Sequence, residues 1–126
     1  MRGYLLQSLG LKLRNRLLLS AISGVLFALP HFANPEVSVN FWLLMCFYAA
    51  IGAFFAWVTL RDQRLELALG AHAANNLFSA LFTSYPNSAL TTPAIFLVNT
   101  LDPVYTLVSV LLIMPVFYWL VFLAAR

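Results

Sequence analysis

With 63% hydrophobic and only 9% charged residues, this chain of 126 residues has too few charges to cover a water-facing surface. We therefore expect its solvent to be a lipid bilayer. Its net charge of +3 comes from a few clustered basic residues with no groove-reading motif, which argues against a nucleic-acid partner. The single cysteine, Cys46, excludes an internal disulfide, and no zinc-finger spacing is present.

Four apolar runs are each close to the roughly 20 residues that a helix needs to cross about 30 Å of hydrocarbon. They cover residues 17–33, 41–60, 65–84 and 104–125. Backbone groups inside a bilayer must form their hydrogen bonds within their own segment, so each run predicts a helix. The expected fold class is an all-α integral membrane helical bundle with four full transmembrane helices. Residues 1–126 would form part of one domain.

The first run also fits a secretory signal peptide. Lys12, Arg14 and Arg16 precede an uncharged apolar stretch, which is the order of charge and hydrophobicity that such peptides show. However, three further apolar runs follow, and cleavage near Ala33 would remove polar residues that matter below. We interpret residues 17–33 as a retained helix.

Basic residues cluster at one end of the expected helices. They are Lys12, Arg14 and Arg16 before the first run, Arg61 and Arg64 between the second and third, and Arg126 after the fourth. The loops at the opposite ends contain no lysine or arginine. The positive-inside rule then puts the basic ends in the cytoplasm, in a multi-pass protein of the plasma (inner) membrane. By the same rule, the helix-like residues up to Leu9 would be the end of a fifth helix.

Polar groups within membrane helices are costly and are therefore candidates for a functional site. Phe27 and His31 are four residues apart, on one helix face. Pro30 lacks an N–H group, which would bend the helix and leave the carbonyl of Leu26 without a partner beside His31. Alternatively, Pro30 only ends the helix and His31 only reaches the membrane interface.

His72 and Asn76 have the same four-residue spacing, with Asn75 at the edge of the same face. Their small neighbours would let another helix approach closely. Asn76 could hold the imidazole of His72 or polarise a carbonyl oxygen. The alternative is that these groups only join helices by hydrogen bonds.

Two imidazoles on different helices could share a metal ion or an activated water molecule. Along straight helices, His31 would lie about 21 Å and His72 about 10 Å from the cytoplasmic ends, which is an unequal depth for a shared site. Hydrolysis also needs a general base, and no carboxylate of the chain is well placed for that role. The site therefore looks incomplete.

These motifs resemble the CPBP intramembrane proteases, the CAAX-processing, bacteriocin-processing or abortive-infection family. That family's pattern is E-E-x-x-x-R, then F-x-x-x-H, then H-x-x-x-N. Phe27 and His31 match the second motif, and His72 and Asn76 match the third. The opening "MRGYLL" looks like the tail of the first motif, with Arg2 as its arginine. The two glutamates would precede Met1, so the chain would be the C-terminal part of such a domain.

The resemblance implies that a glutamate activates water with the help of His31 and His72, while Asn76 supports the site. Arg2 and Phe27 would be supporting residues. His31 and His72 would be the metal ligands if a divalent metal such as zinc is bound; the metal and metal-free mechanisms stay open. The implied substrate is a peptide or prenylated protein. Without the glutamate pair, we expect this chain to be inactive as written.

Two other functions remain open. The chain could be a non-catalytic bacteriocin-immunity or scaffold protein of the same fold. It could also be a small transporter or channel subunit, although the fourth run offers few polar residues for a path, namely Thr106, Ser109 and Tyr118.

Overall fold

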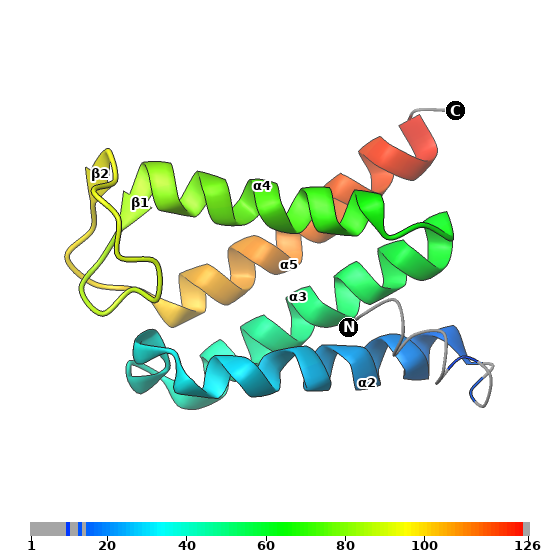
Figure 1. Cartoon of the computed structure of the whole chain (residues 1–126), viewed down its shortest axis with the longest axis horizontal. Coiled ribbons are helices and arrows are strands. Elements are labelled where there is room, and N and C mark those ends of the chain that lie inside the picture. Colours follow the sequence, from blue (N-terminus) through cyan, green and yellow to red (C-terminus); the bar gives the residue numbers. More distant parts are fainter. Residues whose placement is uncertain (1–9, 11–12, 14, 125–126) are drawn as a thin grey trace.

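The helices of this protein form a small bundle, seen in a computed structural model that describes residues 10, 13 and 15–124 (Figure 1). The α-helices are α2 (Arg16–Ala28), α3 (Phe41–Asp62), α4 (Glu66–Phe82) and α5 (Pro103–Trp119). Short 3₁₀ turns, η1 (Leu29–Ala33) and η2 (Pro35–Ser38), follow α2, and a π turn, η3 (Leu120–Ala124), extends α5. The all-α fold class is confirmed.

Three of the expected spans are long and apolar enough to cross a membrane within the described residues. They are Arg16–Ala33, Phe41–Asp62 and Pro103–Ala124. The remaining apolar run forms α4, a helix of 17 residues. The predictions for Arg2, for the end of a fifth helix, and for Lys12, Arg14 and Arg126 fall outside the described residues.

Local capping groups set where the helices begin. The Oδ1 atom of Asn15 accepts hydrogen bonds from the N–H groups of Leu17 and Leu18, at 3.0 and 3.2 Å. Asn40 caps α3 and Asp102 caps α5 in the same way. These side chains occupy N–H groups that have no partner within the helix. At the other end of α3, Gln63 takes the left-handed conformation that stops a helix.

The close packing of α2 against α3 depends on two glycines. A Cβ atom at Gly24 would lie 2.5 Å from the carbonyl oxygen of Ala49, and one at Gly52 would lie 2.6 Å from the Cβ of Phe27. At each contact one of the two helices has no side chain, so the other helix can approach closely, as small residues allow in membranes. Gly52 in particular leaves the space on α3 that the Phe27 side chain fills.

We expect Gly24→Ala to destabilise the bundle by about 1–3 kcal/mol, because the added methyl group meets backbone atoms that cannot rotate away. Gly70→Ala is the matched control: a Cβ there meets nothing within 4 Å. The control should leave stability unchanged or raise it by up to about 1 kcal/mol. Denaturant titration in detergent micelles measures both. Equal stability of the two variants would refute the close contact.

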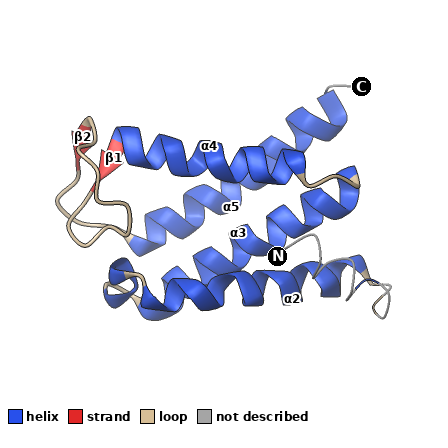
Figure 2. Cartoon of the chain, viewed as in Figure 1, coloured by secondary structure: helices blue, strands red, loops and turns tan. Residues whose placement is uncertain are grey.

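The long segment between α4 and α5 contains a small structured element. Strands β1 (Thr83–Ser84) and β2 (Phe96–Leu97) pair in parallel. The N–H of Ile95 also donates to the carbonyl of Leu81, and Thr92 donates to that of Ala80. The loop is thus folded back onto the end of α4, where it covers one end of the bundle (Figure 2).

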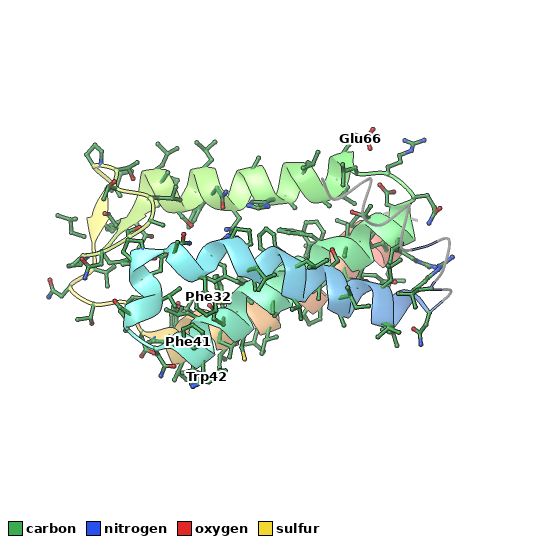
Figure 3. The ribbon with its side chains drawn as sticks, turned by 60° about the horizontal axis from the view of Figure 1, so that its bottom comes forward. Phe32, Phe41, Trp42 and Glu66 are labelled. Carbon is green, nitrogen blue, oxygen red and sulfur yellow. The ribbon has the colours of Figure 1, made fainter. Side chains whose placement is uncertain are left out.

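Aromatic side chains gather where α2 turns into α3. The ring centroids of Phe32 and Phe41 are 4.8 Å apart, and those of Phe41 and Trp42 are 5.1 Å apart. Trp42 is 77% exposed, as expected for an aromatic residue at a membrane interface. Glu66, at the start of α4, lies toward the opposite end of the bundle (Figure 3).

Candidate functional site

His31 lies in the 3₁₀ turn η1, which replaces the last turn of α2 because Pro30 has no N–H to continue the helix. Its Nδ1–H donates to the carbonyl oxygen of Phe27 over 2.9 Å. A carbonyl can only accept, so Nδ1 carries a proton, and in the neutral form of the ring Nε2 then carries the lone pair. The acceptor beside His31 is therefore the carbonyl of Phe27, whereas the sequence suggested that of Leu26.

The Phe27 ring brings the two histidines together. Its centroid is 4.6 Å from that of His31 and 5.6 Å from that of His72. His72 in turn stacks on Phe55, with the centroids 5.5 Å apart and the planes at 14°. Two imidazoles from α2–η1 and α4 thus pack on the same phenyl ring. The unequal depth expected from straight helices is not seen, since a single side chain reaches both.

One face of α3 supports all three of these rings. Tyr48 stacks on His31, Gly52 makes room for Phe27, and Phe55 stacks on His72. The spacing of four and then three residues puts these positions on one side of a helix. The sequence analysis did not identify this face. The signal was present as two aromatic residues seven apart with a glycine between them.

The two asparagines of α4 lie in different surroundings. Asn75 lines an apolar cavity of about 240 Å³ between α3, α4 and α5, next to Phe55 and Met114. Both asparagines are exposed, and Asn76 lies one helical turn beyond His72. Consecutive helix residues are about 100° apart, so Asn76 lies about 40° and Asn75 about 60° around the helix axis from His72, on opposite sides of it. Asn75, predicted at the edge of that face, also lines the cavity that α5 helps to form.

A buried carboxylate near His31 was missed by the sequence analysis. Glu36 lies in the short turn η2 between α2 and α3, and only 4% of it is exposed. Its Oε1 accepts from the Tyr48 hydroxyl at 2.5 Å and from Asn34 at 3.4 Å, and its Oε2 accepts from the N–H of Ala89 at 2.8 Å. Tyr48 stacks on His31 with the centroids 4.1 Å apart. Glu36 therefore contacts the imidazole of His31 indirectly, through the side chain of Tyr48.

The charge of Glu36 also affects the covering loop. Burial, and then the nearby Glu36 carboxylate, raise the pKa of the Tyr85 phenol. A phenol is already neutral at neutral pH, and the upward shift of its pKa keeps it neutral to higher pH. The loop therefore adds no second negative charge beside Glu36.

The other three carboxylates lie away from the histidines. Asp102 accepts from the N–H groups of Val104 and Tyr105 as the cap of α5. Asp62 ends α3, and Glu66 begins α4 and is exposed. None of the chain's four acidic residues is thus in a position to take a proton from water between the two imidazoles.

The described residues do not by themselves fit a zinc centre. A catalytic zinc ion takes three protein ligands. His31 and His72 would supply two, and within residues 15–124 no group of three or more His, Cys, Asp or Glu side chains is close enough to hold a metal. A further ligand would have to come from elsewhere in the polypeptide.

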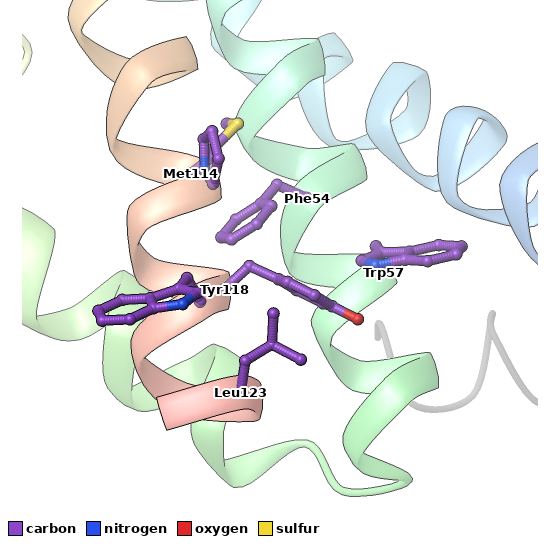
Figure 4. Close-up of a pocket in the computed structure, with 7 residues that line it drawn as sticks. Phe54, Trp57, Met114, Tyr118 and Leu123 are labelled. Carbon is purple, nitrogen blue, oxygen red and sulfur yellow. The ribbon is translucent and has the colours of Figure 1, made fainter. Parts of the chain in front are cut away.

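A separate hollow of about 450 Å³ lies between α3 and α5 (Figure 4). It is lined by Phe54, Trp57, Met114, Pro115, Tyr118, Trp119 and Leu123. It contains no histidine or carboxylate, so it offers no group for acid–base chemistry.

These features define a class of protein: a bundle of membrane-spanning helices that holds a pair of imidazoles between its helices. The family model of the Rce1-like type II CAAX prenyl endopeptidases matches residues 1–78, well over half of the chain, and the chain belongs to that family. The matched region includes His31, His72 and Asn76. The resemblance noted in the sequence is therefore confirmed at the level of the family.

A relative with a known sequence is the uncharacterized protein YyaK of Bacillus subtilis (strain 168). The two are 37% identical over 105 residues, which cover 82% of this chain and 35% of YyaK. The chain thus spans about a third of the length of that relative. No solved structure matches the chain.

Proposed function

We propose that this chain forms part of an intramembrane endopeptidase that hydrolyses peptide bonds in or near the membrane. The substrate would be a peptide or a prenylated protein. The observation that carries the proposal is the packing of His31 and His72 on one phenyl ring, in a chain of the CAAX endopeptidase family. A site shared by two helices is what water activation by an imidazole pair requires.

In this proposal, His31 and His72 flank the attacking water. The Nε2 atom of His31 carries the lone pair because Nδ1 is bound to the carbonyl of Phe27. The amide of Asn76 donates a hydrogen bond to the oxyanion that forms when water attacks a peptide carbonyl. Phe27 sets the distance between the imidazoles. Arg2 would orient the family's glutamate pair, which would supply the general base.

We further propose that residues 1–126 do not catalyse by themselves, since all four of their carboxylates lie elsewhere. The test compares this chain with a polypeptide that also contains the E-E pair of the family motif, both reconstituted in liposomes with a prenylated peptide. Cleavage by the longer protein alone is expected. Equal cleavage by both would contradict the need for the glutamates. No cleavage by either would overturn the endopeptidase.

The placement of the four carboxylates also favours a second candidate, a non-catalytic immunity or scaffold protein. It predicts that His31→Ala and His72→Ala leave protection against a bacteriocin intact, because only bundle packing would matter. Protection assays on cells expressing each variant at equal levels separate the two functions. Loss of protection in both variants would favour the endopeptidase.

For topology, we propose the plasma (inner) membrane, with Arg61 and Arg64 on the cytoplasmic side. In a Cys46→Ser background, a membrane-impermeant maleimide applied to intact cells should label Ser38→Cys and not Glu66→Cys. Both positions are exposed, at opposite ends of α3. The reverse labelling pattern would show that the chain is inserted the other way round.

A further inference from the structure

Glu36 is unusual because it is a carboxylate buried at the end of a membrane bundle, and no basic side chain among residues 15–124 forms an ion pair with it. An ionised carboxylate is tolerated away from water only where hydrogen bonds compensate for its lost hydration. Glu36 has three such bonds, to the Tyr48 hydroxyl, the Asn34 amide and the Ala89 N–H. Both carboxylate oxygens of Glu36 thus accept hydrogen bonds from the protein, so the fold itself stabilises the buried carboxylate.

The three donors come from three different parts of the chain. Tyr48 belongs to α3, and Ala89 belongs to the loop that follows α4, the helix that carries His72. Asn34 lies directly after η1, the turn that contains His31, and its amide also donates to the Tyr48 hydroxyl at 3.1 Å. Glu36 therefore connects α3, the segment directly after His31 and the loop that follows α4.

Through Tyr48 this cluster acts on His31. The Tyr48 ring is fixed at its hydroxyl end by Glu36 and Asn34, while its face stacks on the imidazole at 4.1 Å. The imidazole of His31 is also held by the hydrogen bond from its Nδ1–H to the carbonyl oxygen of Phe27. A ring held at one nitrogen can still rotate about its side-chain bonds, and a fixed aromatic neighbour removes that freedom.

We propose that Glu36 is a positioning residue, which orients His31 by holding the Tyr48 ring against it. The importance of this role for catalysis rests on the proposed endopeptidase function. Glu36 is not itself the general base, because both of its oxygens accept hydrogen bonds from the protein and it is almost completely buried.

The test is NMR of the histidine rings in the whole chain, reconstituted in nanodiscs. The chain has only two histidines, so His72 serves as an internal reference. In Tyr48→Phe and in Glu36→Leu, the His31 ring protons should move downfield as the aromatic face leaves them, while the His72 signals stay in place. Glu36→Gln keeps one acceptor for the Tyr48 hydroxyl and should restore much of the original His31 shift.

The double variant Glu36→Leu/Tyr48→Phe should show no larger His31 shift than either single change, because both act through one hydroxyl. Asp102→Asn is the control, since it removes another outer carboxylate without touching Tyr48. Unmoved His31 signals in both Tyr48→Phe and Glu36→Leu would overturn the proposal. Equal shifts of both histidines would also overturn it, because that pattern means a general loss of structure.

In a polypeptide that cleaves peptides, Glu36→Leu should lower kcat by about tenfold with KM unchanged, as is common for groups that orient a reacting side chain. Retained kcat would overturn the catalytic importance of the positioning. The NMR result does not depend on cleavage, so failure of the endopeptidase proposal and failure of the positioning proposal are distinguishable.

Discussion

His72→Ala and His31→Ala are each expected to lower peptide cleavage by about 10²–10⁴-fold in a polypeptide that contains the family's glutamate pair. The double variant should be no less active than the weaker single variant. Residues that act as one unit lose most of their effect when any member is removed, so their losses do not add. The common contact with Phe27 is the structural reason to treat these two histidines as one unit.

The measurement is kcat/KM in proteoliposomes at equal protein content. Leu77→Ala provides a control on the same helix as His72, at a side chain that is 60% exposed. It should cleave as the unmodified protein does. Cleavage that survives in His72→Ala would exclude His72 from the reaction. Fully additive losses would mean that the histidines act separately.

Asn76→Ala is expected to lower kcat by about 10²–10³-fold, the usual effect of removing one hydrogen-bond donor to an oxyanion. KM should change little, because the charge that Asn76 would stabilise develops only in the transition state. Asn76 is one helical turn from His72 and exposed, so a substrate carbonyl could reach it.

Asn75→Ala is the matched control for Asn76, with the same side chain at the next position of the same helix. Asn75 lines the cavity between α3, α4 and α5, so its loss should leave kcat unchanged. Steady-state kinetics on both variants compares these two neighbouring positions of α4. The reverse result, with Asn75 essential and Asn76 dispensable, would put the reaction in that cavity instead.

Hydrophobicity alone predicted the helices, because a long apolar run has few other stable states in a bilayer. Their ends were less predictable. The first run was expected to be one helix over residues 17–33, whereas α2 stops at Ala28 and η1 continues it. Pro30 indicated a change there, but the switch to a 3₁₀ turn depends on local geometry. The strands β1 and β2 have only two residues each, too few for an alternating pattern that would predict them.

The site was predicted only in part, because some of its contacts join residues close in sequence and others join residues far apart. The four-residue spacings of Phe27 with His31 and of His72 with Asn76 are local and can be read along one helix. Glu36 depends on Ala89, 53 residues away, and on Tyr48 in another helix. A glutamate in a short polar loop looks like an exposed residue until those partners are known. Only the folded chain shows that it is buried.

The central claim is that His31 and His72 meet at the ring of Phe27, and magic-angle-spinning NMR of the whole chain in lipid tests it most directly. With phenylalanine rings labelled with ¹³C and histidines with ¹⁵N, one phenylalanine ring should show cross-peaks to both imidazoles. Those cross-peaks should vanish in Phe27→Leu, while the cross-peak between His72 and Phe55 remains. If no phenylalanine ring correlates with both histidines, the shared site does not exist.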